Sequence, residues 1–156
     1  MIPRIGQAFD VHPFTDDPDR RLVLGGIELP GPGLAGHSDA DVVAHAAADA
    51  LLGAAGLGDL GTHFPDTDPA YAGIDSMELL ARVVLSVNGD WQIGNVDVTV
   101  ITEAPRLAPH RGAMQERMTE VVGAPVSIKP KRAEALGALG RREGIACLAV
   151  ALLVPR

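Results

Sequence analysis

Most of the architecture follows from one segment, Asp39-Ala-Asp-Val-Val-Ala-His-Ala-Ala-Ala-Asp-Ala-Leu-Leu-Gly-Ala-Ala55. Its apolar residues recur with helical spacing, and Gly56 follows as a helix stop. Ser38 stands three residues before Asp41, the spacing of a capping box, and predicts where the helix begins. We therefore expect a helix from Asp39 to about Ala55.

Strands and further helices are predicted on both sides of this helix. The predicted elements are strands over 5–12, 95–102, 126–129 and 145–153, a small hairpin over 21–29, and helices from Asp75 or Ser76 to about Asn88 and over 110–122. Loops are expected over 58–71, 104–109 and 131–144, with the proline-bounded acidic stretch His63–Pro69 lacking regular structure.

The order of these elements predicts an α+β fold with a mixed β-sheet and helices mainly on one face. The last strand is apolar on both faces, so it should lie inside the sheet. Neither repeats nor linkers divide the 156 residues, which indicates a single domain over 1–156. The uncovered face of the sheet needs a partner, so we expect an oligomer.

Composition and charge exclude several functions. With 13 basic and 20 acidic residues the formal charge is −7, which disfavours nucleic-acid binding. The longest apolar run, Ile145–Val154, is about half of a membrane span, and the N-terminal region lacks the pattern of a signal peptide. We expect a cytoplasmic protein. A single cysteine, Cys147, leaves histidines and carboxylates as the ligands for any metal.

Two histidines and a carboxylate form a candidate metal site. Asp10 and His12 lie two residues apart on a predicted strand and so point the same way. Asp41, His45 and Asp49 recur every four residues along one stripe of the helix, so His45 joins the pair if the helix starts near that strand end. This is the ligand set of a zinc site with an open fourth position. The alternative is a strand end whose polar groups face water.

Other polar segments surround this candidate site. The start of the helix at His37–Asp41 suits an anion such as phosphate, although helix capping accounts for part of its composition. Asp59 either follows a simple helix stop or accepts hydrogen bonds from substrate hydroxyls. The stretch Phe64–Asp68 matches no calcium loop, and a solvated acidic turn is favoured.

Several long motifs occur in order along the chain: Phe9-Asp-Val-His12, Gly36-His-Ser-Asp-Ala-Asp-Val42 with His45, Asp49–Ala55, Gly58-Asp-Leu-Gly61, Phe64–Pro69, Gly94–Thr99 and Glu143–Cys147. In these motifs the chain resembles the 2-C-methyl-D-erythritol 2,4-cyclodiphosphate synthase family of the non-mevalonate isoprenoid pathway. The resemblance implies a homotrimeric lyase with active sites at subunit interfaces. Its reaction converts 4-diphosphocytidyl-2-C-methyl-D-erythritol 2-phosphate to the cyclic diphosphate and CMP, by attack of the substrate's own 2-phosphate on the β-phosphate.

The resemblance also implies roles for individual residues. Zn²⁺ would be held, one ion per subunit, by Asp10, His12 and His45, and Mg²⁺ or Mn²⁺ on the substrate diphosphate would be held by Glu134. The implied substrate-binding residues are His37, Ser38, Asp59, Gly61, Phe64, Pro65, Asp66, Asp68, Ala104, Pro105, Arg106, Leu107, Lys131, Arg132 and Arg141. His37 and Arg132 are the implied catalytic residues. Arg141 and Glu143 would flank a cavity on the trimer axis that accepts isoprenoid diphosphates.

The segment Lys129-Pro-Lys-Arg-Ala-Glu134 departs from the family, which has a run of threonines there. We expect Lys131 and Arg132 to bind phosphate by charge in their place; the alternative is an altered nucleotide site. Ala138 and Leu139 also replace a common Phe-Thr pair, which should reshape the axial cavity.

Two further functions are compatible with such a chain. A metal-dependent phosphohydrolase would use water in place of the internal phosphate. A trimeric binding protein for isoprenoid diphosphates would retain ligand binding without releasing CMP. The product of the reaction distinguishes the three.

Overall fold

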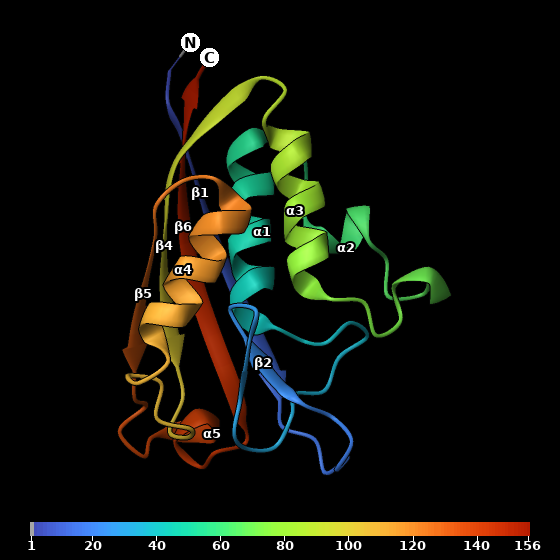
Figure 1. Ribbon diagram of the computed structural model, residues 1–156, viewed down its shortest axis with the longest axis vertical. Helices are drawn as coiled ribbons and strands as arrows, with labels where there is room; N and C mark the ends of the chain where they lie inside the picture. Colours follow the sequence, from blue (N-terminus) through green and yellow to red (C-terminus); the bar gives the residue numbers. More distant parts are fainter. Residues whose placement is uncertain (1) are drawn as a thin grey trace.

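A four-stranded sheet forms the centre of the molecule, which the computed structural model describes over residues 2–156 (Figure 1). Its strands stand in the order β1-β6-β4-β5. β6 runs antiparallel to both neighbours whereas β4 and β5 are parallel, so the sheet is mixed, as predicted. The strands are β1 (Arg4–Pro13), β4 (Trp91–Ile101), β5 (Val126–Lys131) and β6 (Gly144–Pro155).

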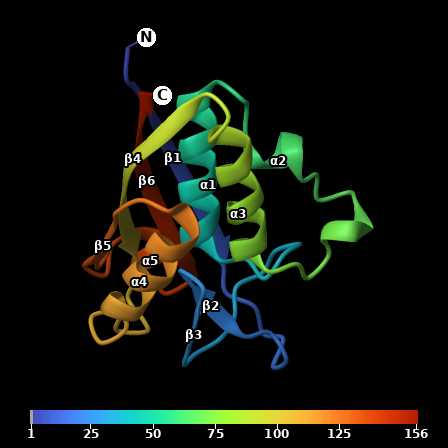
Figure 2. The same ribbon diagram turned by 45° about the horizontal axis from the view of Figure 1, so that its top comes forward.

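The long helices cover one face of this sheet (Figures 1 and 2). They are α1 (Val42–Ala55), α3 (Ser76–Val87) and α4 (Arg111–Val122). The central helix α1 packs so closely on β1 that a Cβ at Gly6 would lie 1.9 Å from the carbonyl oxygen of Ala50. Only glycine fits at this position, and this contact sets how closely α1 approaches β1.

The start of α1 differs from the prediction. The helix begins at Val42, and its N-cap is Asp41 rather than Ser38, so the predicted capping box is wrong. The Asp41 carboxylate is buried and accepts N–H bonds from Val43 and Ala44 of the helix. It also accepts the N–H groups of Gly25 and Gly26. One side chain therefore caps α1 and attaches it to the predicted hairpin, formed by β2 (Leu22–Leu24) and β3 (Ile27–Leu29).

Short helical turns occur inside two predicted loops. Within 58–71 lie α2 (Leu60–His63) and the 3₁₀ turn η1 (Pro69–Tyr71), and within 131–144 lies α5 (Gly137–Gly140). The prediction that all of His63–Pro69 is irregular is therefore wrong at its two ends. Acidic side chains explain the first two turns, because Asp59 accepts the N–H of Thr62 and Asp68 accepts that of Ala70.

The remaining predicted elements are present, but β4 begins at Trp91, four residues before the predicted start, and β5 continues to Lys131, two residues past the predicted end. Asp75 caps α3, Asn88 ends it, and Gly56 ends α1 in the left-handed conformation with φ of 73°. The apolar strand β6 lies inside the sheet, with β1 on one side and β4 on the other.

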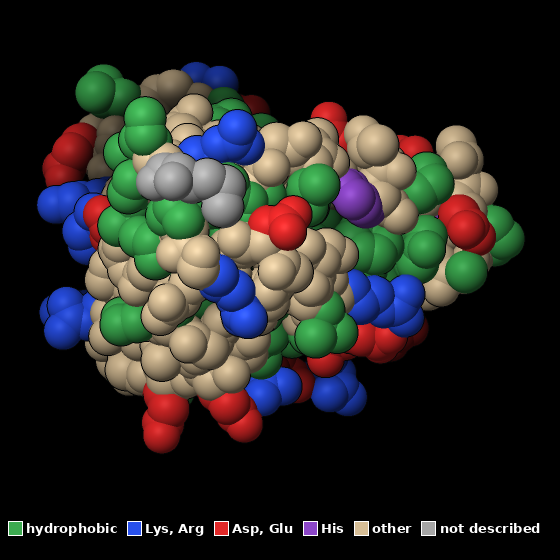
Figure 3. All heavy atoms as spheres, turned by 90° about the horizontal axis from the view of Figure 1, so that it is seen from above, with side chains coloured by type: hydrophobic (Ala, Val, Ile, Leu, Met, Phe, Trp, Pro, Cys, Tyr) green, Lys and Arg blue, Asp and Glu red, His purple; other side chains and the backbone are tan. Residues whose placement is uncertain are grey.

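The face of the sheet opposite the helices carries exposed apolar side chains. On β1 these are Ile5, Phe9 and Val11, and on β6 Val150. Their alternate neighbours Ala8 and Ala149 point toward the helices and are buried. On the face seen from above, acidic and basic side chains are interspersed (Figure 3). In the described part of the chain, each helix is too short or too polar to cross a bilayer.

Candidate active site

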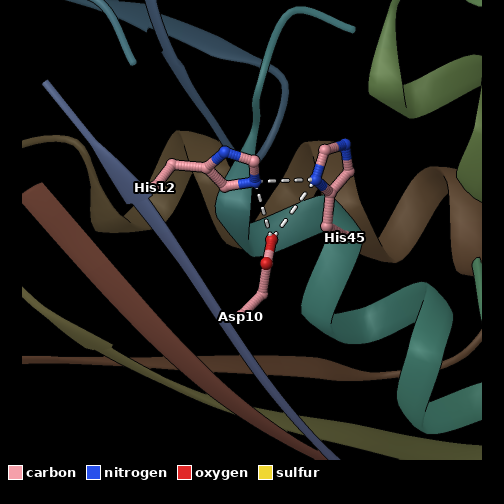
Figure 4. Close-up of side chains that lie close together, drawn as sticks. All are labelled: Asp10, His12 and His45. Carbon is pink, nitrogen blue, oxygen red and sulfur yellow. Dashed lines mark hydrogen bonds and ion pairs between the residues drawn. The ribbon is translucent and has the colours of Figure 1, made fainter. Parts of the chain in front are cut away.

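Asp10 and His12 at the end of β1 converge with His45 from α1 (Figure 4). His12 Nε2 lies 3.1 Å from Asp10 Oδ2, and His45 Nδ1 lies 3.2 Å from the same oxygen. The two nitrogens are 3.2 Å apart. The three predicted ligand atoms thus form a nearly equilateral triangle, and they form the one group of potential metal ligands found among the described residues.

This triangle fits a metal ion. A tetrahedral site with bonds of about 2.0 Å places neighbouring ligand atoms about 3.3 Å apart. His12 Nδ1 lies 2.8 Å from the carbonyl oxygen of Ala35, which can only accept, so this nitrogen donates. The lone pair of His12 Nε2 is therefore directed at the centre of the triangle. A carboxylate and two imidazoles suit Zn²⁺ and several other divalent ions, and the geometry does not distinguish among them.

The electrostatics of the triad favour a cation at its centre. Burial by itself would raise the pKa of Asp10, but the hydrogen bonds and charges of His12 and His45 hold it well below its ordinary value. Burial likewise opposes the charged form of His12, yet the Asp10 carboxylate raises the pKa of this imidazole overall. A metal ion bound here would compete with the proton whose binding to His12 the Asp10 carboxylate favours.

A cavity of about 530 Å³ opens beside the triad, and we call it the metal cavity. Its lining includes the three triad residues together with six further residues predicted from the family resemblance: His37, Ser38, Gly61, Phe64, Pro65 and Asp66. Asp49, one turn beyond His45 on the predicted stripe, also lines it. Asp41, the third member of that stripe, does not, because its carboxylate caps α1.

Asp59 and Asp68, two predicted substrate-binding residues of the segment next to this cavity, do not line it. The carboxylates of Asp59 and Asp68 cap short turns, and the main-chain oxygen of Asp68 accepts a hydrogen bond from His37 Nε2 at 2.9 Å. Sequence reasoning missed Tyr71, which lines the same cavity. Its ring is edge-on to the ring of Phe64, with the two ring centroids 5.4 Å apart. The short turn η1, which carries Tyr71, gave no periodic signal.

Arg20 fixes the loop that leads into α1, and sequence reasoning missed it as well. Its guanidinium donates to the carbonyl oxygens of Leu34 at 2.8 Å and Gly36 at 3.0 Å, and to that of Ser38. Between these carbonyls lies Ala35, the acceptor for His12. Arg20 therefore holds the segment that orients one ligand of the triad.

A second cavity, of about 440 Å³, shares none of these lining residues, and we call it the cationic cavity. It brings together five predicted residues: Pro105, Arg106, Leu107, Lys131 and Arg132. Glu103 was not predicted. It is only 4 % exposed at its side chain and accepts a hydrogen bond from Arg132 at 2.9 Å, which holds the pKa of the carboxyl below its ordinary value.

Three other predicted residues lie outside both cavities. Ala104, joined to Pro105 by a cis peptide, lines a neighbouring hollow together with Phe14 and Arg142, and Pro105 lines both this hollow and the cationic cavity. Glu134 is exposed, and Arg141 pairs with Glu143 at 2.6 Å. A single copy of the chain therefore does not gather all the residues that the resemblance implies.

The fold and the triad define a class of protein: a single α+β domain with a candidate metal centre of two histidines and one aspartate at the edge of a mixed sheet. The chain belongs to the YgbB family, whose sequence profile matches residues 3–154.

Relatives within this family carry a common name. The chain is 52 % identical over 155 residues to the 2-C-methyl-D-erythritol 2,4-cyclodiphosphate synthase of Thiobacillus denitrificans, covering 96 % of each chain. It is 54 % identical to the enzyme of that name from Symbiobacterium thermophilum, covering 97 % of this chain and 99 % of the relative. A structure of IspF from Plasmodium falciparum as a CDP complex superposes with a TM-score of 0.85 at 33 % identity, covering 99 % of this chain and 97 % of that one.

Proposed function

We propose that this chain is a 2-C-methyl-D-erythritol 2,4-cyclodiphosphate synthase, a lyase of isoprenoid biosynthesis. It converts 4-diphosphocytidyl-2-C-methyl-D-erythritol 2-phosphate to 2-C-methyl-D-erythritol 2,4-cyclodiphosphate and CMP. The observation that carries the proposal is the Asp10, His12 and His45 triad at tetrahedral spacing, in a chain 52 % identical to a synthase over nearly its full length.

The metal cavity receives the methylerythritol and β-phosphate parts of the substrate. Asp10, His12 and His45 would hold Zn²⁺, and a bound ion would supply a Lewis acid for a phosphate oxygen of the substrate. His37 Nε2 donates to the Asp68 carbonyl oxygen, which fixes the imidazole in the wall of the metal cavity beside the substrate phosphates. Asp59 and Ser38 position the substrate hydroxyls and phosphate.

The reaction needs no nucleophile from the protein, because the substrate supplies its own 2-phosphate. The chain has to bring two anionic groups into line and neutralise their repulsion. Phe64, Pro65 and Tyr71 supply an apolar wall for this cavity, which limits the access of competing water.

The cationic cavity receives the nucleotide. Pro105 and Leu107, with Ala104 at the start of this loop, contact the cytidine, and Arg106, Lys131 and Arg132 bind the diphosphate. Glu134, an exposed carboxylate, would help to hold Mg²⁺ or Mn²⁺, which would neutralise charge on that diphosphate. Support comes from the three cations that line one hollow and from the relative solved as a CDP complex.

The active enzyme is a homotrimer in which the metal cavity of one subunit faces the cationic cavity of the next. Two observations support this: the cavities share no lining residue, and Ile5, Phe9, Val11 and Val150 leave an exposed apolar face on the sheet. Residues 1–156 act as one synthase domain, with the cytoplasm as its predicted location. Arg141 and Glu143 border an axial cavity for isoprenoid diphosphates.

Light scattering tests the assembly. Phe9→Lys places a charge on the exposed apolar face and is expected to yield monomers, while the wild type runs as a trimer. Leu85→Lys is the matched control, because Leu85 is 75 % exposed on α3 and Phe9 is 57 % exposed on β1. A monomeric wild type at assay concentration contradicts a site built from two chains.

A phosphorus NMR time course with the cytidine diphosphate substrate, Zn²⁺ and Mg²⁺ tests the reaction. We expect CMP and a cyclic diphosphate to appear together. CMP with an open-chain phosphate would instead identify a phosphohydrolase. Retained binding of isoprenoid diphosphates without any product would identify a binding protein.

A further inference from the structure

A chain of hydrogen bonds leads away from the metal triad, from His45 through Ser76 to Asp39. His45 Nε2 lies 2.8 Å from Ser76 Oγ, and the Ser76 hydroxyl donates a hydrogen bond to Asp39 Oδ1. Ser76 is 1 % exposed, so its hydroxyl has to find its partners within the protein. At the level of sequence, Ser76 is only a candidate helix cap, but Asp75 takes that position.

Asp39 determines the direction of the protons in this chain. A carboxylate offers only acceptors, and its two oxygens already accept the N–H groups of Asp41 at 3.1 Å and of Ser76 at 3.2 Å. The Ser76 hydroxyl therefore donates to Asp39 and has only lone pairs left for His45. His45 Nε2 must carry the proton, which leaves Nδ1 unprotonated and facing Asp10 and His12.

We propose that Asp39 and Ser76 are positioning residues that set the tautomer of His45 and so keep Nδ1 free to bind a metal ion. The opposite tautomer would place a hydrogen on Nδ1, 3.2 Å from His12 Nε2, and would block coordination. The inference rests on the metal centre proposed above. Both residues act through His45 and touch none of the three ligand atoms.

Ser38 does not set this direction by itself. Its hydroxyl lies 3.0 Å from His45 Nε2 and 3.2 Å from Ser76 Oγ, and it accepts the N–H of Ala40. Its proton can point to either neighbour, so it is compatible with both tautomers of His45. Only the carboxylate of Asp39, which has no proton to give, fixes the chain in one direction.

Asp39→Asn is the informative substitution. In one of its two orientations the amide donates to Ser76 Oγ, which turns the hydroxyl proton toward His45 Nε2 and moves the imidazole proton to Nδ1. We expect Zn²⁺ affinity to fall about 10-fold to 100-fold, the range for residues that orient metal ligands. Ser76→Ala should cost less, because Ser38 can still accept from Nε2.

The double variant Asp39→Asn/Ser76→Ala separates this role from a structural one. Without the Ser76 hydroxyl, the amide cannot pass the wrong proton on to His45. Zn²⁺ affinity should therefore recover by at least threefold relative to Asp39→Asn alone, although the double variant has lost more hydrogen bonds. A merely structural role predicts the opposite order.

The experiment is a competition titration of metal-free full-length protein with Zn²⁺ and a chromophoric chelator. Ser86→Ala serves as control, because Ser86 is an exposed residue of α3 whose hydroxyl bonds only to Arg82. Weaker binding by Asp39→Asn, recovery in the double variant and no change in Ser86→Ala support the proposal. Binding within twofold of wild type by an Asp39→Asn protein whose His45 carries its proton on Nδ1, as read by nitrogen NMR, overturns it. Weakened binding by Asp39→Asn with no recovery in the double variant overturns it as well.

A second measurement does not depend on how the variants fold. Nitrogen NMR of ¹⁵N-histidine-labelled, metal-free wild-type protein reports which ring nitrogen of His45 carries the proton. Protonated Nε2 and bare Nδ1 are expected, and the reverse overturns the proposal. If the wild type failed to bind Zn²⁺ while His45 had the expected tautomer, the proposed metal site would be wrong. Asp39 and Ser76 would then still set the tautomer of His45, but not for metal binding.

Discussion

The two cavities of this molecule are constructed differently. In the metal cavity each histidine ligand is held by a second contact: His12 by the Ala35 carbonyl and His45 by the hydroxyls of Ser38 and Ser76. In the cationic cavity the basic groups are exposed to solvent, and Arg132, 67 % exposed at its side chain, is held by one partner, the buried carboxylate of Glu103.

This difference indicates a division of labour. Metal ligands need fixed positions, because coordination tolerates little displacement of the ligand atoms. Cations that bind a flexible diphosphate can adjust to it, and long side chains on exposed backbone allow that adjustment. We therefore expect the metal cavity to tolerate substitution poorly and the cationic cavity to tolerate it well.

The largest effect is expected for His45→Ala. Removal of one of three ligands should weaken Zn²⁺ binding by more than about 100-fold, beyond the range seen for residues that only orient a ligand, and abolish turnover. Chelator competition and CMP release measure the two losses. His63→Ala is the control, since His63 is exposed and bonds to the Leu57 carbonyl. An active, zinc-loaded His45→Ala protein would show that the ligand set is wrong.

Acidification should act on the metal cavity in the same direction. His12 binds a proton more tightly than a free histidine does, because Asp10 raises its pKa, and the metal must displace that proton. Zn²⁺ affinity should therefore rise with pH and fall by about tenfold for each pH unit below the pKa of His12. Titrations with Zn²⁺ at a series of pH values measure the slope. A Zn²⁺ affinity that stays constant between about pH 5 and about pH 8, the range in which histidines titrate, would contradict this expectation.

An intermediate effect is expected in the cationic cavity. Arg132→Ala should raise KM about tenfold, the equivalent of one hydrogen bond between charged groups, with a smaller change in kcat. Steady-state kinetics of CMP release measure both constants. Arg117→Ala is the control, because Arg117 pairs with Glu120 on the exposed side of α4. An unchanged KM would mean that Arg132 does not replace the threonine of the family.

The smallest effects distinguish two adjacent arginines. Arg20→Met removes the donor for three carbonyls of the 34–38 loop and should lower the free energy of unfolding by about 1–2 kcal/mol. Arg21→Met breaks only an exposed pair with Glu28 and should cost about 0–0.5 kcal/mol. Urea denaturation compares them, and equal losses would show that Arg20 does not brace the loop.

The spacing of residues along the sequence predicted the secondary structure and the metal triad. The spacing of apolar residues located α1 and the apolar run of β6 placed it inside the sheet, because both signals come from neighbouring residues. The triad was predicted from alternation on a strand and a stripe on a helix, and the structure confirms that these three residues meet.

Contacts between distant segments could not be predicted in this way. Glu103 meets Arg132 across 29 positions, and Asp41 binds the turn at Gly25, 16 positions away. Ser38 and Asp41 carry equally good capping groups, and the choice between them depends on that distant turn. Asp75 and Ser76 are likewise both suitable N-caps for α3. Asp75 is the cap in the structure, whereas Ser76 contacts His45 of the neighbouring helix.

The placement of the triad has a consequence for the chain as a polymer. Two ligands lie on β1 and the third on α1, so a bound ion is a cross-link that closes the loop of residues 13–44, which contains the hairpin and Arg20. If the ion stayed bound in the unfolded chain, it would restrict that chain as a disulfide does. If it bound only the folded protein, it would stabilise the folded state by mass action. The thermal stability of the protein should therefore depend on the concentration of the metal ion. Insertions into the exposed turn around Asp17 should leave the metal site intact, because hydrogen bonds of Thr15 and Arg20 hold both ends of this turn.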